Sequence, residues 1–177
     1  MSESEEKSPI SSPQATEAPL YILAPFVPTP PEVVERMLQL GEVTTQDTVF
    51  DLGCGDGRII IAAAKKCGAR GVGLDIEPYR VAESQANARA AGVEQLVKCI
   101  NQDAMTVDLS SATVVMLYLV HWSTEKLLPV ISKTARPGTR IISHNFGMAG
   151  WPAVRTEELK DEAGETHTLY LWVVGHA

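Results

Sequence analysis

The sequence predicts an α/β fold, a doubly wound, Rossmann-like sheet of about seven strands that is mostly parallel and ends in an antiparallel hairpin. The first observation behind this is that short apolar segments alternate with helical patterns between residues 31 and 145. The second is a glycine-rich turn at 51–57, which joins the first of these segments to a helix. The third is that no long helical pattern separates the last candidate strands, which indicates an antiparallel ending.

The first half of the chain supplies a leading helix and then alternates strands with helices. Pro31 suits the first turn of the leading helix and Gly41 suits its end, while Gly68 and Gly92 close the two helices that follow. The predicted elements are a helix over 32–40, a strand over 48–52, a helix over 58–67, a strand over 70–75, a helix over 78–91 and a strand over 96–101.

The second half opens on a segment, 113–120, that is β-branched and apolar without alternation. This pattern is typical of a central parallel strand covered on both faces. Ser123 is a plausible N-cap for the next helix. The remaining predicted elements are a helix over 123–135, a strand over 139–145 and two strands over 154–159 and 168–174, joined by a polar hairpin loop at 161–165.

Length and composition predict one globular domain with a tail. The chain has 177 residues, and residues 20–177 suit a single domain, whereas residues 1–19 form an acidic, Ser/Pro-rich stretch that we expect to be disordered. The net charge of −7 argues against unspecific binding to nucleic acid or anionic membranes. No signal peptide or membrane-spanning pattern is evident, and the cysteines show no metal-site spacing. We expect a cytoplasmic protein without a metal.

The glycine turn has the pattern D-x-G-x-G-x-G, which begins at Asp51 and contains Gly53, Gly55 and Gly57. Glycines tolerate positive φ and let a ligand approach the backbone. A dinucleotide fingerprint, G-x-G-x-x-G, needs glycine at position 58, where this chain has Arg58. The turn instead resembles the first motif of class I S-adenosylmethionine-dependent methyltransferases. We expect Arg58 to neutralise an acid of the turn, either Asp56 or Asp51.

Acidic residues follow the ends of the second and third predicted strands. Asp75 ends the second strand, where doubly wound folds place an acid against ribose hydroxyls, and Glu77 is the alternative. The resemblance assigns Asp103 to the adenine amine and implies that Asp51 orients the amino-acid end of the cofactor. It also places three neighbours at the cofactor: Ile76, Gln102 and Ala104.

Each of these acids alone has an ordinary structural explanation. Asp51 could be a loop acid, Asp75 a helix N-terminal acid and Asp103 the former of an Asx turn. Taken together, they end successive strands whose carboxyl ends converge on one crevice. That coincidence favours a cofactor site. Cys54, inside the turn, is expected to be a small filler because nothing nearby supplies a base.

Longer phrases resemble one branch of these enzymes, the small archaeal and bacterial seven-strand protein lysine methyltransferases related to a mitochondrial lysine methyltransferase family. The phrases lie at residues 25–30, 51–60, 112–115, 136–144 and 168–173. The mitochondrial relatives carry an apolar N-terminal segment, whereas this chain has an acidic polar tail. Membrane attachment is therefore not implied. The resemblance implies a protein-lysine N-methyltransferase that uses S-adenosyl-L-methionine.

The fourth strand ends without the Asp/Asn-Pro-Pro-Tyr/Phe signature of enzymes that methylate planar nitrogens, because residues 117–122 read Leu-Tyr-Leu-Val-His-Trp. Tyr118 is our preferred active-site residue, although it could also be an aromatic packed in the sheet. His144 is either a general base or a hydrogen-bonded structural histidine. We expect substrate contacts from residues beside the crevice: Trp122, Asn145, Phe146 and Trp151.

The proline-rich leader at 25–30 is stiff enough to lie over the cofactor as a lid. Thr29 is then placed to bond the cofactor carboxylate, although the segment could be a plain extended leader packed on the sheet edge. We expect His167 and His176, near the C-terminus, to be surface residues.

Other functions remain open at this point. A small-molecule or RNA methyltransferase could use the same fold, since fold does not determine the acceptor. A cofactor-binding module without catalysis is a further alternative, and a nicotinamide oxidoreductase is the weakest. The expected partners are lysine-bearing proteins rather than nucleic acid or membrane, and a monomer is the preferred oligomeric state.

Overall fold

The computed structural model of the protein describes residues 27–119 and 121–176, with the backbone alone at 121–123. The tail predicted over 1–19 lies outside these residues. The elements are α1 (Pro31–Leu40), β1 (Thr48–Leu52), α2 (Arg58–Cys67), β2 (Arg70–Asp75), α3 (Pro78–Ala90), β3 (Val97–Asn101), the 3₁₀ turn η1 (Ala104–Thr106), β4 (Val114–Leu117), α4 (His121–Thr134), β5 (Arg140–His144), β6 (Arg155–Lys160) and β7 (Thr166–Val173).

The strands form one sheet in the order β3-β2-β1-β4-β5-β7-β6. Strands β1 to β5 are parallel to one another, while β7 runs antiparallel to β5 and β6 antiparallel to β7. The predicted doubly wound sheet with its antiparallel hairpin is therefore confirmed. The strand order reverses between β1 and β4, and ligands of such sheets bind outside the strand ends at this position.

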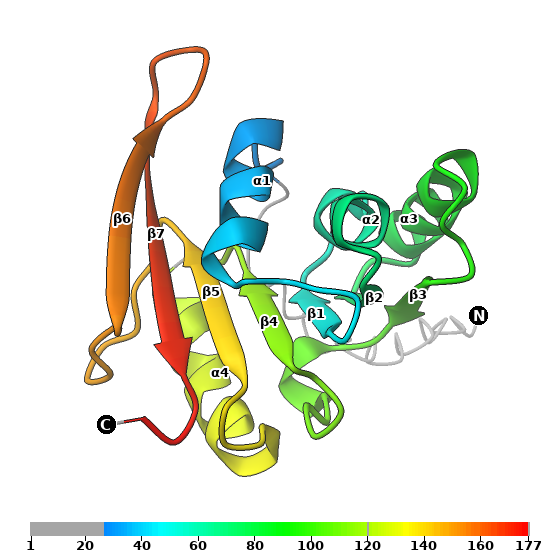
Figure 1. The fold of residues 1–177 in the computed structure, drawn as a ribbon. Helices are drawn as coiled ribbons and strands as arrows, with labels where there is room; N and C mark the ends of the chain where they lie inside the picture. Colours follow the sequence, from blue (N-terminus) through cyan, green and yellow to red (C-terminus); the bar gives the residue numbers. More distant parts are fainter. Residues whose placement is uncertain (1–26, 120, 177) are drawn as a thin grey trace, which may run out of the picture.

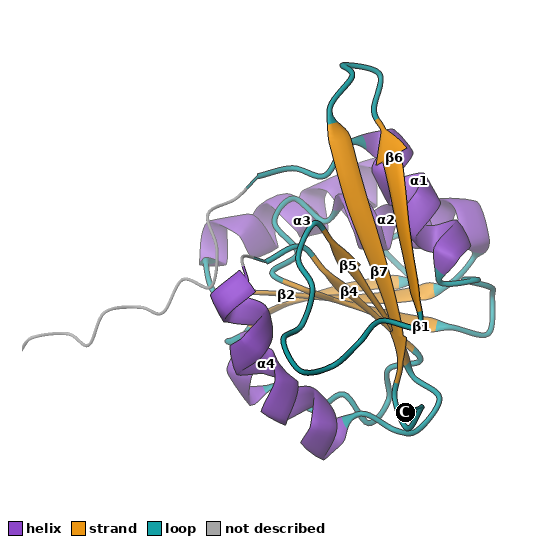
Figure 2. Ribbon diagram, turned by 90° about the vertical axis from the view of Figure 1, so that its left-hand side faces the viewer, coloured by secondary structure: helices purple, strands orange, loops and turns teal. Residues whose placement is uncertain are grey.

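Helices cover both faces of the sheet, with α1, α2 and α3 on one side and α4 on the other (Figures 1 and 2). Burial of each large apolar side chain stabilises the fold by roughly 1.5–3 kcal/mol. The cluster on the α1 face includes Val34, Met37, Ile59, Met116 and Ile142. The cluster on the α4 face includes Leu117, Leu127, Ile131, Ile141 and Trp172.

The β6–β7 hairpin closes one side of the sheet and rises past α1 (Figure 2). Its outer strand is polar and alternates exposed with half-buried residues, as suits a sheet edge. Arg36 of α1 donates two hydrogen bonds to the Glu157 carboxylate of β6, at 2.7 and 2.8 Å. The Glu162 N–H in the hairpin loop donates to Glu32 Oε1 at 2.9 Å. These contacts fix the loop beside the start of α1.

Two predicted boundaries differ from the structure. The fourth strand covers only Val114–Leu117, because pairing with β1 and β5 stops there, so Tyr118 lies beyond its end. Helix α4 begins at His121, which places Ser123 inside its first turn, so the predicted N-cap was wrong. Among the helices of the described residues, none has the length and apolar character to cross a bilayer.

Candidate active site

The turn between β1 and α2 is built on left-handed glycines. Gly53, Gly55 and Gly57 have φ values of 80°, 55° and 82°, a region that costs other residues roughly 1–2 kcal/mol. The N–H groups of Gly53 and Cys54 both donate to Leu74 O, at 2.8 and 2.9 Å. These bonds hold the turn against the end of β2.

Helix α3 supports the turn from the other side. Ser84 Oγ donates to Gly55 O at 2.7 Å, and Asn87 Nδ2 donates to Asp56 O at 2.9 Å. A Cβ added at Gly57 would lie 3.1 Å from Ser84 Cβ and Oγ. Cys54 is buried, and burial raises the pKa of its thiol, which suits a filler rather than a nucleophile.

Asp75 connects the turn to the start of α3. Its Oδ2 accepts the Gly55 N–H and its Oδ1 accepts the Glu77 N–H, both at 3.0 Å. Asn101 Nδ2 donates to the carbonyl oxygens of Asp75 and Ile76 at 3.0 Å. The carboxylate is thus fixed at the end of β2, and each oxygen retains a lone pair for a ligand hydroxyl.

Asp51 is a buried acid beneath this turn, with 3% of its surface exposed. Burial, together with the carboxylates of Asp75 and Asp56, raises its pKa to about 8. We find no hydrogen bond to its carboxyl group from the described side chains and backbone. A buried carboxyl without a partner is costly, and a ligand ammonium group would compensate it.

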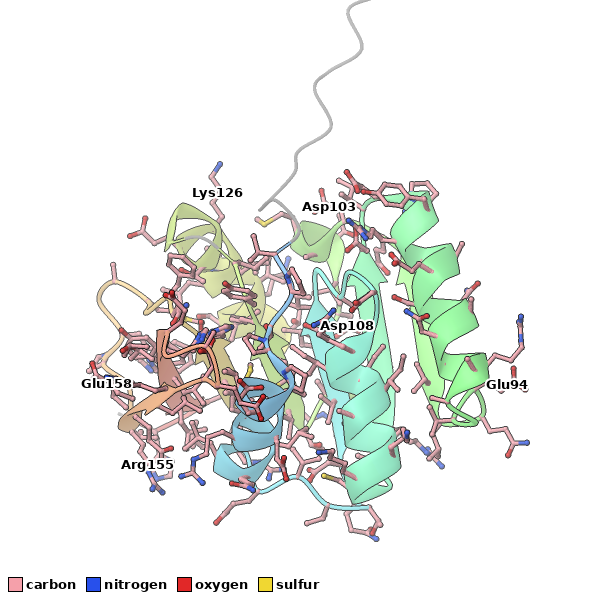
Figure 3. All side chains as sticks on the ribbon, turned by 90° about the horizontal axis from the view of Figure 1, so that it is seen from above. Glu94, Asp103, Asp108, Lys126, Arg155 and Glu158 are labelled. Carbon is pink, nitrogen blue, oxygen red and sulfur yellow. The ribbon has the colours of Figure 1, made fainter. Side chains whose placement is uncertain are left out.

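Asp103 follows β3 and caps η1, where its Oδ1 accepts the Met105 N–H at 2.9 Å. Figure 3 shows it at the edge of the molecule where α3 begins, with Glu94 at the far end of that helix. Its neighbour Ala104 is buried, whereas the Gln102 side chain donates to Thr106. The structure therefore brings Asp103 to the edge that carries the ends of β1 and β2.

Arg58 joins the leader to the glycine turn. Its guanidinium binds both carboxylate oxygens of Asp56, and its Nη1 donates to Thr29 O at 3.0 Å. Burial raises the pKa of Asp56, but the hydrogen bonds from Arg58 outweigh it and hold that pKa below its ordinary value. Of the two acids expected to pair with Arg58, the structure selects Asp56.

Aromatic rings gather where β4 and β5 end. The Tyr118 ring lies 4.0 Å from the His144 ring and 6.5 Å from the Phe146 ring, measured between centroids. Burial raises the pKa of Tyr118, and a hydrogen bond to the Asn145 side chain opposes this effect. Tyr118 is only half-buried. This cluster is the wall that the sequence predicted beside the crevice.

Other predicted substrate contacts have structural partners. Asn145 has a φ of 65°, and it donates its N–H to Thr168 O at 2.7 Å and accepts the Thr168 N–H at 2.9 Å through Oδ1. Trp151 packs against Trp172 on the α4 face, with 5.9 Å between ring centroids. The Trp122 side chain lies outside the described residues.

A chain of hydrogen bonds leads from the leader to the hairpin loop. Thr29 Oγ1 lies 3.2 Å from His144 Nδ1, and His144 Nε2 lies 2.7 Å from His167 Nδ1. His167 Nε2 lies 2.8 Å from Asp161 Oδ2. Burial, and then the proximity of His167, lowers the pKa of His144 to about 4, so its ring is neutral at pH 7.

His167 is buried, so the expectation that it is a surface residue was wrong. Its position in β7 alternates with Leu169 and Leu171, which pack on the α1 face, and this period of two was the available signal. His176 is exposed, as expected.

Comparison with known proteins gives one family and several close relatives. The model of the ANTKMT methyltransferase domain matches residues 51–155. A protein-lysine N-methyltransferase of Saccharolobus islandicus (strain REY15A) is 44% identical over 153 residues, which cover 85% of this chain and 94% of the relative. An ATP synthase lysine N-methyltransferase of Homo sapiens is 29% identical over 142 residues, which span 80% of this chain and 60% of the human protein.

Solved structures share the same fold. The crystal structure of an RNA methyltransferase from Salinibacter ruber in complex with S-adenosyl-L-homocysteine has a TM-score of 0.79 and 44% sequence identity. The match covers 85% of this chain and 95% of that protein. Its bound ligand is the product of methyl transfer from S-adenosylmethionine.

Proposed function

The chain belongs to the ANTKMT methyltransferase family, and we propose that it is a protein-lysine N-methyltransferase. It is an S-adenosylmethionine-dependent methyltransferase. The observation that carries the lysine assignment is the 44% identity to the Saccharolobus enzyme, because the match extends over 94% of that enzyme and therefore includes the acceptor side of its fold.

The residues around the glycine turn fit the cofactor. We assign the ribose hydroxyls to Asp75, whose oxygens are held in place by two N–H groups. We assign the cofactor ammonium to the vicinity of Asp51, because a cation would compensate that buried acid. The adenine amine is assigned to Asp103. The remaining proposed cofactor contacts are Gly53, Gly55, Gly57, Ile76, Gln102 and Ala104.

When bound, S-adenosylmethionine supplies an activated methyl group. The residues of this chain have to remove the charge of the lysine amine and align it, because a protonated amine has no lone pair for attack. The rings of Tyr118 and Phe146 form an apolar wall that disfavours the ammonium form by desolvation. The Tyr118 hydroxyl, bonded to Asn145, is placed to receive a hydrogen bond from the amine.

The test is incubation of the purified full chain with S-adenosylmethionine labelled in the methyl group and a cytoplasmic protein extract. We expect protein-bound label that acid hydrolysis releases as N-methyllysine. Label recovered only in RNA or in small molecules would contradict the proposal. A parallel reaction with Asp75→Asn separates enzymatic from spontaneous labelling.

RNA methylation is the second candidate, and the observation that favours it is the Salinibacter structure, which is described as an RNA methyltransferase at the same 44% identity. The net charge of −7 opposes it, since phosphate recognition needs basic residues. Treating the same extract with ribonuclease or with protease before the reaction distinguishes the two. RNA methylation predicts that ribonuclease abolishes labelling, and lysine methylation predicts that protease does.

A further inference from the structure

The two buried histidines connect the candidate active site to the surface hairpin. His144 ends β5 beside Tyr118, and His167 lies on the neighbouring strand β7. Thr29 stands at one end of the chain of bonds and Asp161 at the other. The loop residues that follow Asp161, at 162–165, are exposed. The path therefore begins at the crevice and ends next to water.

Donor and acceptor chemistry fixes the direction of these bonds. The hydrogen bond from His167 holds the pKa of Asp161 below its ordinary value, so Asp161 is a carboxylate and only accepts. His167 Nε2 must then donate to it. His144 is neutral and carries one N–H, which leaves two consistent arrangements of the chain.

In the first arrangement His167 is neutral. His144 Nε2–H donates to His167 Nδ1, and the Thr29 hydroxyl donates to His144 Nδ1. In the second arrangement His167 carries an extra proton and donates from Nδ1 to His144 Nε2. His144 then donates from Nδ1 to the Thr29 oxygen. The two arrangements differ by one proton, and no side chain has to move.

We propose that Thr29, His144, His167 and Asp161 form a proton relay that accepts a proton from the acceptor lysine and delivers it to the hairpin surface. The inference rests on the proposed function and assigns it residues outside the cofactor motifs. Thr29 and His144 are the members next to the crevice. His167 and Asp161 act through them, as positioning and proton-holding residues.

The step balances in protons and bonds. One N–H bond of the lysine ammonium breaks, and its proton forms an O–H bond at Thr29 as the original hydroxyl proton passes to His144 Nδ1. The Nε2 proton of His144 passes to His167 Nδ1. The result is a neutral amine with a lone pair and a His167 cation beside the Asp161 carboxylate, which releases the proton to water.

This arrangement explains how a buried histidine can serve a base. His144 alone is a poor proton acceptor, because burial favours its neutral form. In the relay it remains neutral throughout, since it gains a proton at one nitrogen while it loses one at the other. The charge instead rests on His167, against a carboxylate.

The relay also changes the role of Thr29. In the resting arrangement the Thr29 hydroxyl proton is used by His144, so the oxygen presents only lone pairs to the crevice. Such an oxygen accepts a proton from an amine and cannot donate to a cofactor carboxylate. The relay therefore replaces the carboxylate-binding role that the sequence suggested for Thr29.

The first test measures N-methyllysine formation in the extract assay above, at saturating cofactor, between pH 6 and 10 (approximate range chosen around the ordinary pKa values of His and Lys). We expect Asp161→Asn and His167→Phe to lower the initial rate about tenfold or more. Asp161→Asn should also move the acid limb of the pH profile to lower pH, because His167 loses the carboxylate that stabilises its cation. The other charged or titratable neighbours, Glu32, Glu165 and Tyr118, are unchanged in this variant.

Matched controls are Glu165→Gln, in the same loop, and His176→Phe, an exposed histidine outside the chain of bonds. Both should keep the wild-type rate, and all four variants should bind S-adenosylmethionine within about twofold of wild type, less than the tenfold that about 1.4 kcal/mol represents. If wild type forms N-methyllysine and the two relay variants keep its rate and profile, the relay is wrong. If wild type forms none, the proposed function fails instead.

The second test needs no activity. Ring ¹⁵N NMR of the full-length wild-type protein at pH 7 should show His144 and His167 as neutral rings protonated at Nε2. A resting His167 already protonated at both nitrogens would overturn the proposal, because the relay could not accept another proton. This measurement also covers the case in which a buried variant such as His167→Phe fails to fold.

Discussion

The Asp75 carboxylate accepts the Gly55 N–H at 3.0 Å, so the acid that we assign to the ribose also holds the middle of the glycine turn. The second oxygen accepts the Glu77 N–H, which ties the same side chain to the start of α3. A single carboxylate therefore shapes the cofactor site and offers its remaining lone pairs to the ligand.

Asp75→Asn should weaken S-adenosylmethionine binding about 10- to 100-fold, because the amide loses the charge and turns an N–H₂ group toward one of the two N–H donors. Isothermal titration calorimetry measures this loss. Asp108→Asn is the control, since exposed Asp108 also accepts a local N–H, from Ser110. Unchanged affinity in Asp75→Asn would refute the ribose assignment.

Asp51→Asn should stabilise the protein without cofactor, and more at pH 8 than at pH 5. In the unfolded chain the Asp51 carboxyl ionises near 3.8, whereas in the folded protein it keeps its proton to about 8. Wild-type stability therefore falls as the pH rises from about 4 to about 8. Urea unfolding at the two pH values should show a gap between variant and wild type that widens by on the order of a few kcal/mol.

The same Asp51→Asn variant should bind S-adenosylmethionine more weakly, because the charge that compensates the ammonium is gone. Glu162→Gln, which removes an exposed charge in the hairpin loop, should change neither property. A gap in unfolding free energy that stays constant between pH 5 and pH 8 would show that Asp51 ionises normally in the folded protein.

Gly57→Ala should destabilise the protein and lower its cofactor affinity. The residue has a φ of 82°, and its new Cβ would lie 3.1 Å from Ser84. Gly164→Ala is a matched control, because Gly164 has a φ of 85° but no atom within 4 Å of the added Cβ. Thermal unfolding of both variants separates backbone strain, roughly 1–2 kcal/mol, from the contact with α3. Equal losses would show that the contact with Ser84 relaxes without cost.

Tyr118→Phe should lower the rate of lysine methylation about tenfold and leave cofactor affinity unchanged. The substitution keeps the apolar ring beside Phe146 and removes the hydroxyl that bonds Asn145. Tyr170→Phe is the control, because Tyr170 stacks on Trp172 on the opposite face of the sheet. A full rate in Tyr118→Phe would mean that the ring alone is required.

The sequence predicted most of the fold because local signals agreed with the final packing. Gly68 closes α2 in the left-handed conformation, and β1 and β2 have the predicted bounds. The boundaries of β4 and α4 were less accurate. The run of apolar residues over 113–120 has no alternation to mark where pairing stops, and strand pairing with β1 and β5 decides it.

The candidate site was only partly predictable. The acids Asp51, Asp75 and Asp103 end successive strands, so topology alone brings them to one edge. The contact between His144 and His167 depends on the antiparallel register of β5 and β7, which pairs His144 with Leu169. A short strand fixes no such register by composition, and for that reason His167 was expected at the surface.

The position of β7 also separates two tasks within one sheet. The cofactor motifs follow β1, β2 and β3 at one side, while His167 and Asp161 belong to the hairpin at the other side. Mutations in the hairpin can therefore alter how the enzyme handles the charge of its acceptor without disturbing the turn that holds the nucleoside. Such independence gives evolution a route to new acceptors, and to new pH ranges of activity, through a segment of the chain that takes no part in nucleoside recognition.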